Sequence, residues 1–481
     1  MGGSEFPAMM MLAVFLILHG SLVIADLEVS ETRESVARDP NTKLVFVGTR
    51  HGNRNPAQFL KNITSWGKEG EMELTSFGKR QAYGLGVSVR SFVGDLVESN
   101  YLSKETKAYS SSANRCQMTL QAALAGIFPP QDFAEWNQKL DWTPVPYQID
   151  DPMLRMYAVS PCPNSDAAWQ PISDDNLPEL VRLTREKKAF MDHVASHTGW
   201  NASISNMADV ADNLIEIQLY NSPMPDWIAR PTLPGYDEAR MIKEILEFSE
   251  NHQNMCADYA PCRNLMGGVW LKHILDTLKK QVDGKANDLN LVIYASHTEV
   301  TLSVMKLLYN DQHEVTTSAG FVLEFRDKPA PSVRLLSHEP GHNNVDEHTI
   351  YQATYLPQLK AICPGNWCPL DAFIRLVSGT AIDDWKAGCG VLKCDEKKPD
   401  NSGTANVATT ALSADSNTSA TSSSGFDRDC AREVDELGAY CSVWARHGFC
   451  AMHRPTKYLH CRKTCLCDKP AVQLPAALRA T

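Results

Sequence analysis

The sequence predicts an α/β fold with three α/β/α layers, a helical cap over the sheet and a small disulfide-rich module at the C-terminus. Short β-branched runs at 43–48 (KLVFVG) and 289–295 (LNLVIYA) are typical of buried parallel strands. Longer amphipathic stretches follow, and strands that alternate with helices favour a sheet covered on both faces. Six closely spaced cysteines near the C-terminus indicate the module.

Helical patterns fill most of the rest of the body. The region from about 131 to 270 has few strand signals, so we expect it to form the helical cap over the sheet. The stretches with helical periodicity are Thr75–Leu96, Met118–Ile127, Leu177–His197, Glu238–His252 and Val269–Val282.

Composition limits the class of function. The chain has 481 residues, of which 43% are hydrophobic, and this is enough for a large core. A net charge of −11 and a pI near 5.7 argue against a nucleic-acid partner. The 14 cysteines, an even number, favour an oxidising compartment.

The N-terminus predicts secretion. Met9–Ala25 is a short apolar run that ends in small residues, which is typical of a signal peptide and too short to span a bilayer. We therefore assign residues 1–25 to a signal peptide, although no basic residue precedes the run and MGGSEFPA resembles an expression tag. A buried N-terminal helix is the alternative. No other segment is apolar enough for a membrane span.

Sequons at Asn62, Asn201 and Asn417 predict a glycoprotein.

A change in composition divides the chain. Residues 395–429 are rich in Ser, Thr, Ala and Asn and cannot bury enough apolar surface to fold, so we expect a flexible, O-glycosylated linker. The linker separates a body at 30–394 from the module at 430–467, and a tail occupies 468–481.

The first chemical motif is RHGNRNP at 50–56, directly after a predicted strand. Ligands of open α/β sheets bind beyond the carboxyl ends of strands, so Arg50, His51 and Arg54 are expected to face one cleft. Guanidinium groups suit a phosphate because they donate bidentate hydrogen bonds, and a histidine between them can act as nucleophile or base.

Two further segments point to the same cleft. His297 follows the second strand and precedes a helix, whose N-terminus favours an anion. Arg115 stands where a short strand ending near Ser111 turns into a helix. Each residue taken alone can equally be a structural ion-pair residue, but the ordered set at strand ends indicates a phosphate pocket.

These residues resemble the histidine acid phosphatases, closest to the animal secreted and lysosomal enzymes. Arg50, His51, Gly52, Arg54 and Pro56 match the signature R-H-G-x-R-x-P of that family. The resemblance also rests on the helix motif L-T-x-x-G-x-x-Q-x-x-x-L-G and covers about 40–394. It implies a phosphoglycerate-mutase-like sheet; the mutases share R-H-G but are shorter and lack the cap. The motif residues of the helix are Leu74, Thr75, Gly78, Gln81, Leu85 and Gly86.

The resemblance implies a mechanism without a cofactor or metal. His51 would attack the phosphorus of a small phosphomonoester and form a phosphohistidine that water then hydrolyses. Arg50, Arg54, Arg115 and His297 would hold the non-bridging oxygens. Some members are dimers, so a homodimer is among the expected partners.

The sequence departs from the family after the second histidine. The usual pair is His-Asp, whose Asp protonates the leaving alcohol, whereas here Thr298 follows His297. The related inositol-polyphosphate branch has His-Ala-Glu, so Glu299 is the expected proton donor, with a pKa lowered by the helix dipole and the flanking arginines. The alternative is a pseudophosphatase, a secreted binding or host-modulating protein that uses its pocket or its C-terminal module.

The resemblance also implies disulfides in the body, namely Cys162–Cys389 and Cys363–Cys368. Cys256 and Cys262 are expected to close a local loop. Cys116 and Cys394 lack assigned partners; we expect a disulfide for Cys116 in preference to a free thiol.

The module resembles the ShK-toxin-like (ShKT) domain, which is frequent in secreted nematode proteins. The domain's pattern implies Cys430–Cys467, Cys441–Cys461 and Cys450–Cys465, although spacing alone leaves the pairing open. From Arg446 to Lys463 the module has five Lys/Arg, three His and no acid, which suits an anionic or receptor partner as well as it suits an ordinary solvated surface. Blockade of a potassium channel through Lys457 and Tyr458 is a weaker alternative.

Overall fold

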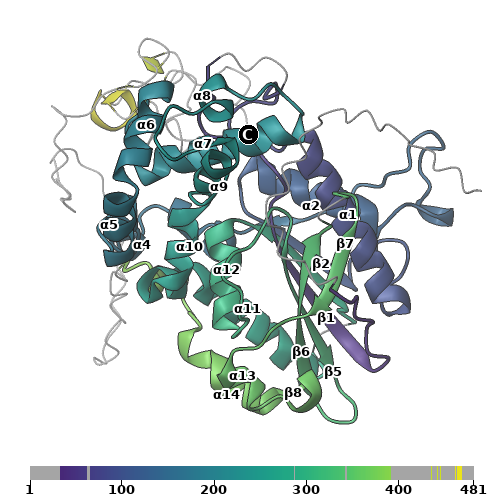
Figure 1. Ribbon diagram of the computed structural model, residues 1–481. Helices are drawn as coiled ribbons and strands as arrows, with labels where there is room; N and C mark the ends of the chain where they lie inside the picture. Colours follow the sequence, from purple (N-terminus) through teal and green to yellow (C-terminus); the bar gives the residue numbers. More distant parts are fainter. Residues whose placement is uncertain are drawn as a thin grey trace, which may run out of the picture. The chain divides into compact units, whose positions relative to one another are not determined.

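The computed structural model describes residues 33–61, 66–285, 288–341 and 344–391, and, further on, 435, 441–442, 445, 461 and 463–468. The chain divides into two units, Met1–Lys397 and Lys398–Thr481. The first unit contains the sheet and its helices (Figure 1).

A mixed eight-stranded sheet forms the centre of the first unit, with the strand order β3-β2-β4-β1-β5-β6-β7 and β8 paired to β6. Strands β3, β2, β4 and β1 are parallel, while β5 to β8 are antiparallel. The strands are β1 Thr42–Arg50, β2 Thr106–Ser110, β3 Gln148–Ile149, β4 Leu291–Ser296, β5 Gly320–Arg326, β6 Ser332–Pro340, β7 His348–Gln352 and β8 Cys368–Pro369.

Helices cover both faces of this sheet, which gives three layers. Leu44 and Phe46 of β1 pack into one apolar cluster with Trp270 of α11, whereas Val45 and Val47 pack into a second cluster with residues of α1 and α2. Successive side chains of a strand point to opposite faces, so β1 supplies both cores. Helices α1 and α2 lie together on one side of the sheet in Figure 1, and α11 and α12 lie on the other. The predicted fold class is therefore confirmed.

The chain between β3 and β4 is helical, and in Figure 1 helices α4 to α10 group to one side of the sheet. The α-helices of the described residues are α1 Ser76–Val93, α2 Asn114–Ile127, α3 Asp151–Leu154, α4 Pro163–Ser173, α5 Pro178–Glu186, α6 Lys188–Thr198, α7 Ile204–Leu219, α8 Asp226–Ala229, α9 Glu238–Leu246, α10 Asn251–Asp258, α11 Ala260–Val282, α12 Thr298–Leu307, α13 Pro357–Lys360, α14 Leu370–Val377 and α15 Trp385–Gly388. The 3₁₀ turns are Gly94–Leu96, Asp132–Ala134, Met156–Ala158, Pro364–Asn366 and Ser378–Thr380.

Two predicted helices are interrupted. The stretch 177–197 divides into α5 and α6 at Lys187, and 238–252 divides into α9 and α10, with Glu250 in a left-handed conformation between them. Periodicity alone misses such breaks, because the apolar stripe continues across them. A third predicted helix, 269–282, begins nine residues earlier as α11, where Pro261 stands in the first turn.

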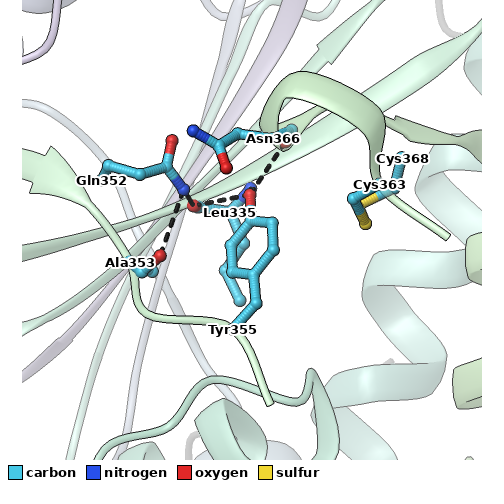
Figure 2. Close-up of a disulfide and its surroundings, with 7 residues drawn as sticks. All are labelled: Leu335, Gln352, Ala353, Tyr355, Cys363, Asn366 and Cys368. Carbon is cyan, nitrogen blue, oxygen red and sulfur yellow. Dashed lines mark hydrogen bonds between the residues drawn. A yellow bond between two sulfur atoms is a disulfide. The ribbon is translucent and has the colours of Figure 1, made fainter. Parts of the chain in front are cut away.

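Hydrogen bonds and disulfides hold the C-terminal part of the first unit against the sheet. Figure 2 shows Tyr355, whose hydroxyl accepts the N–H of Leu335 on β6 at 3.0 Å and lies 2.9 Å from the carbonyl oxygen of Asn366. Disulfides join Cys363 to Cys368 and Cys256 to Cys262, as the sequence led us to expect. The third expected disulfide joins Cys162, just before α4, to Cys389.

In the second unit, the described residues form a small cross-linked group. A disulfide joins Cys441 to Cys461, and the side chain of Asp435 accepts hydrogen bonds from the backbone N–H and the hydroxyl of Thr464. Cys465 and Cys467 are also disulfide-bonded. The expected partners Cys430 and Cys450 lie outside the described residues, as do Asn62, Asn417 and the signal peptide. Asn201 is exposed just before α7.

Candidate active site

The ends of three adjacent parallel strands bring the predicted site residues together. In the sheet, β4 lies between β1 and β2, with Arg50 opposite Ser296 and Ser110 opposite Ala295. The backbone N–H of His51 donates to the carbonyl oxygen of Ser296 at 2.9 Å. The segments that follow the three strands therefore meet at one edge of the sheet, as expected from the sequence.

Close backbone packing holds the motif loop against α1. A Cβ atom on Gly52 would lie 2.4 Å from the carbonyl oxygen of Gly78, and one on Gly78 would lie 2.1 Å from that of Asn53. Only glycine fits at both positions. The N-terminus of α1 is also stabilised where it meets the loop, because the Thr75 hydroxyl accepts the N–H of Gly78 at 3.2 Å. The conformation of the loop is thus fixed by the helix motif that follows it.

A cavity of about 850 Å³ opens at this edge. Of the six predicted site residues, Arg50 alone does not line it; the structure places Arg50 behind the cleft, in a second cavity of about 420 Å³. Three lining residues that the sequence analysis missed are Arg155, Tyr157 and Glu250. The predicted residues that line the cavity are His51, Arg54, Arg115, His297 and Glu299.

His51 has the form that a nucleophile needs. Its Nδ1 lies 2.8 Å from the carbonyl oxygen of Gly52, which can only accept, so Nδ1 carries the hydrogen and Nε2 keeps its lone pair. Burial lowers the pKa of His51 well below its ordinary value, and the nearby charges of Arg115 and Arg50 lower it further. The imidazole is therefore neutral even in mild acid.

His297 is held by two hydrogen bonds. The guanidinium of Arg115 can only donate, so Nδ1 of His297 accepts from its Nη2 at 3.1 Å. Nε2 then donates to Oγ of Ser111 at 2.9 Å. Burial, followed by the charge of Arg115, lowers the pKa of His297 well below its ordinary value. In this neutral form no ring N–H is left for a phosphate oxygen, so the expected contact requires protonation of Nδ1.

One side of the site, which we call the paired wall, consists of Arg50, Arg54, Asp212 and Glu250. The side chain of Arg50 is buried, and 11–16% of the surface of the other three side chains is exposed. Arg50 forms an ion pair with Glu250 and donates to the carbonyl oxygen of Val315 at 2.8 Å. Arg54 lies 2.7 Å from Asp212 and 3.8 Å from Glu250. The positive charge of both arginines is thus compensated within the protein.

Glu250, like Asp212, is a residue of this wall that no motif marks. It caps α10 in a left-handed conformation with φ 56°, which is uncommon for a residue other than glycine. Burial alone would raise the pKa of Glu250, but the charges of Arg50 and Arg54 and a hydrogen bond from Thr298 outweigh it and lower the pKa. A carboxylate therefore occupies a place beside two of the arginines predicted to bind phosphate.

The opposite side, which we call the unpaired wall, consists of Arg115 and Arg155. Among the residues that the structure describes, no carboxylate lies within ion-pair distance of either guanidinium, and the buried Nε of each has no hydrogen-bond partner. Arg155 stacks on Tyr157, with 5.6 Å from its central carbon to the ring centroid. These two charges are free to meet an anion.

Glu299 lies in the first turn of α12 and is buried. The expectation of a lowered pKa for this carboxyl is wrong. Burial raises the pKa of Glu299, with the charge of Glu250 adding to it, and this outweighs the opposing charge of Arg115. The carboxyl also interacts with the Tyr157 hydroxyl, which in turn interacts with Arg155. The raised pKa favours the protonated carboxyl, which can donate its proton.

Cys116 is a free thiol, so the disulfide expected for it is wrong. Its sulfur lies 3.2 Å from the carbonyl oxygen of Ser296 and 3.5 Å from Nε2 of His297. Burial raises the pKa of Cys116 to about 11, so the thiol packs behind His297 as an unreactive group. Cys394, the other cysteine without an assigned partner, lies outside the described residues.

The cleft at the strand ends contains a neutral histidine and several arginines, an arrangement suited to binding phosphate. Sequence comparison identifies the family. Residues 28–320 match the Histidine phosphatase superfamily (branch 2). The chain belongs to this superfamily.

Its relatives include acid phosphatases. The chain is 24% identical over 370 residues to lysosomal acid phosphatase of Xenopus laevis, covering 74% of this chain and 80% of the relative. It is 24% identical over 372 residues to prostatic acid phosphatase of Bos taurus, covering 74% and 89%. Among solved structures, the phytase of Hafnia alvei in its apo form superposes with a TM-score of 0.55 at 14% identity, over 73% of this chain and 98% of the phytase. This last likeness concerns the fold.

No helix in the described part of the chain is long and apolar enough to cross a membrane. Within the same residues, no group of three or more His, Cys, Asp or Glu side chains is arranged to hold a metal ion.

Proposed function

We propose that the protein is an acid phosphatase that hydrolyses small phosphomonoesters through a phosphohistidine on His51. The observation that carries the proposal is the state of His51. It is neutral, its Nε2 lone pair is free, and it lines a cleft together with Arg54 and Arg115. The acid phosphatases among the relatives support the same class of reaction.

In the first step, Nε2 of His51 attacks the phosphorus and the bond from phosphorus to the leaving oxygen breaks. Glu299 gives its proton to that oxygen, so the alcohol departs neutral. In the second step, water attacks the phosphohistidine, Glu299 takes a proton from the water, and the bond from phosphorus to Nε2 breaks. Inorganic phosphate leaves, and both residues return to their starting forms.

Positive charge stabilises the transferring phosphoryl group in this scheme. Arg54 and Arg115 reach the cleft directly, and the charge of Arg50 acts on His51 from behind the cleft. The negative charge of bound substrate raises the proton affinity of His297, whose Nδ1 then donates to a phosphate oxygen. Protonation of both His297 and Glu299 is favoured by acid, so the scheme predicts activity at low pH.

The paired wall favours a second candidate function, a pseudophosphatase. Glu250 already neutralises Arg50 and lies near Arg54, and an incoming phosphate would meet its negative charge. In this case the protein would act by binding, through the cleft or through the proposed ShKT module at 430–467. Turnover separates the two functions, because a binding protein shows saturable affinity for phosphate and no product.

We also propose that the protein is secreted, with residues 1–25 removed, a linker at 395–429, and glycans on Asn62, Asn201 and Asn417. The cysteine content and the disulfides of the first unit support this proposal. Protein expressed in a eukaryotic host should begin near Asp26. N-terminal sequencing checks this, and retention of residues 1–25 would contradict it.

The decisive experiment is hydrolysis of an aryl phosphate and several alkyl phosphates across acidic pH, with the parent protein and with His51→Ala. The proposal expects release of phosphate by the parent and a loss of roughly 10⁴-fold or more in the variant. His313→Ala, at an exposed histidine outside the cleft, is the matched control. Substantial activity in His51→Ala would overturn the covalent mechanism.

A further inference from the structure

The cleft holds a positive charge that the proposed reaction does not use. Arg155 lines the same cavity as His51 and His297, yet no family motif includes it. Its hydrogen bond to Oγ of Ser112 is long, at 3.4 Å, and among the described residues it has no carboxylate within ion-pair distance. A partly buried guanidinium without a counter-ion favours an anion from outside the protein.

Arg155 is placed relative to the reacting group by Tyr157. Tyr157 interacts electrostatically with both Arg155 and Glu299. The Tyr157 ring is fixed on both sides, 5.6 Å from the ring of His297 and 6.4 Å from that of Trp169. Because Glu299 protonates the leaving oxygen in the proposed mechanism, Arg155 stands on the side of the cleft that receives the leaving alcohol.

The size of the cavity agrees with this placement. At about 850 Å³ it lies in the range of small-molecule sites and exceeds what a phosphoryl group fills. Helix α4 lines the remaining space with Ser165, Gln170 and Ser173, which are polar and uncharged, and with Asp166. The alcohol of the substrate therefore enters a largely polar region, which also contains the ring of Trp169 and in which Arg155 lies beside Tyr157.

We propose that Arg155 binds a second anionic group, a carboxylate or a phosphate, on the leaving alcohol of the substrate. The proposal rests on the proposed phosphatase function and narrows it. Preferred substrates are phosphomonoesters whose alcohol is itself negatively charged. The paired wall cannot take this role, because Arg50 and Arg54 already have carboxylate partners.

Two substrates that differ at one group test this inference. Glycerol 2-phosphate and 2-phosphoglycerate differ only in that one hydroxymethyl group becomes a carboxylate. The parent protein should show a kcat/KM at least about tenfold higher for 2-phosphoglycerate, as expected for one charge-assisted hydrogen-bonded pair. Arg155→Gln should bring the ratio close to one while largely keeping activity on glycerol 2-phosphate. A bisphosphate of similar size replaces the carboxylate by a phosphate and shows which anion is preferred.

Two control variants make the result specific. Arg155→Lys keeps the charge and should retain part of the preference, and Arg182→Gln, at an exposed arginine of α5, should leave the ratio unchanged. An unchanged ratio in Arg155→Gln would overturn the proposal. Equal losses on both substrates would also overturn it, since they would mean that Arg155 only positions Tyr157 and Glu299.

A binding measurement separates this inference from the phosphatase proposal. In His51→Ala, calorimetry should give about tenfold tighter binding of 2-phosphoglycerate than of glycerol 2-phosphate, and the added Arg155→Gln change should remove the difference. This result can hold even if the parent protein hydrolyses neither compound, in which case the phosphatase function alone fails. Equal affinities in His51→Ala would overturn the role of Arg155.

Discussion

The two walls of the cleft carry the same kind of side chain in different electrostatic states. On the paired wall, Arg50 and Arg54 contact Glu250 and Asp212, and Coulomb attraction within the protein already satisfies them. On the unpaired wall, the guanidinium of Arg115 contacts a neutral histidine. The pairing partners come from α7 and the cap of α10, far along the chain from the motif. The number of arginines in a motif therefore does not give the positive charge available to a ligand.

The difference between the two walls also predicts which arginine substitutions lower stability and which do not. Removing an arginine that has a buried carboxylate partner leaves an uncompensated charge, which costs about 3–5 kcal/mol of folding free energy. Removing an arginine without such a partner leaves no buried charge behind. Substitutions on the paired wall should thus act on folding, whereas on the unpaired wall a substitution of Arg115 should act on the reaction and one of Arg155 on the choice of substrate.

Within the comparison of the two walls, the largest effect is expected beside the unpaired wall, at Glu299. Glu299→Gln cannot donate a proton, so hydrolysis of an alkyl phosphate should fall by about 10²–10⁴-fold, while phosphoenzyme formation from an aryl phosphate is largely spared. Because burial raises the pKa of Glu299, hydrolysis of alkyl phosphate by the parent should fall only as the pH rises through that raised pKa. The pH profile of the variant should not show this fall. Rapid-quench kinetics on both substrates checks the prediction, and equal losses on both would assign Glu299 a structural role.

The next effect compares one arginine from each wall. Arg115→Gln should lower kcat by about 10²–10³-fold with little change in stability, as for the loss of one donor to the transition state. Arg54→Gln leaves Asp212 buried without its partner and should destabilise the fold by about 3–5 kcal/mol. Urea unfolding and steady-state kinetics on both variants measure the two effects. The comparison of the walls breaks down if Arg115→Gln is the less stable of the two.

A smaller effect is expected at Glu250. Glu250→Gln removes the internal anion beside Arg50 and Arg54, so inorganic phosphate should bind about tenfold more tightly. The same change should lower the melting temperature in the absence of phosphate, and added phosphate should restore it. Calorimetry and thermal unfolding provide the two readings. Unchanged affinity for phosphate would show that Glu250 does not compete with the ligand.

The last effect concerns stability alone, at Glu216, which lines the second cavity. Asn53 donates to one carboxylate oxygen at 2.7 Å and the other oxygen has no partner, and burial raises the pKa of Glu216 to about 7. The folded state therefore binds this proton more tightly than the unfolded state does, and the resulting stability is lost as the pH rises from about 4.5 to about 7. Charging Glu216 costs on the order of 3 kcal/mol by pH 8.

Glu216→Gln, which cannot charge, should match the parent in thermal stability near pH 4.5 and exceed it by several degrees near pH 8. Thermal unfolding of both proteins at the two pH values checks this. A difference that is the same at both pH values would show that the effect is one of packing and not of charge.

The sequence predicted the part of the site that depends on strand ends. His51, Arg115 and His297 each follow a buried strand, and parallel neighbours place such residues at the same edge of a sheet. The antiparallel half of the sheet, β5 to β8, was not predicted, because its strands lie outside the motifs used. The partners Glu250 and Asp212 belong to helices without a local signal. Their contacts arise only when those helices pack against the strand ends.

The state of each predicted residue also required the structure. Arg50 has the expected position in the chain, but Glu250 and Val315 hold its guanidinium behind the cleft. Glu299 has a raised pKa where the helix dipole alone suggested a lowered one, because burial is the larger effect. Burial and counter-ions are properties of tertiary packing, and local sequence carries little information about either.

The position of β4 between β1 and β2 has a consequence for protein synthesis. The residues of β1 and β2 leave the ribosome long before Leu291–Ser296, yet in the finished sheet they do not touch each other, since β4 separates them. A nascent chain that ends before β4 carries His51 and every arginine of both walls and still has no cleft. Truncated transcripts or early proteolytic fragments that retain the whole R-H-G-x-R-x-P motif should therefore be inert, whatever the motif suggests.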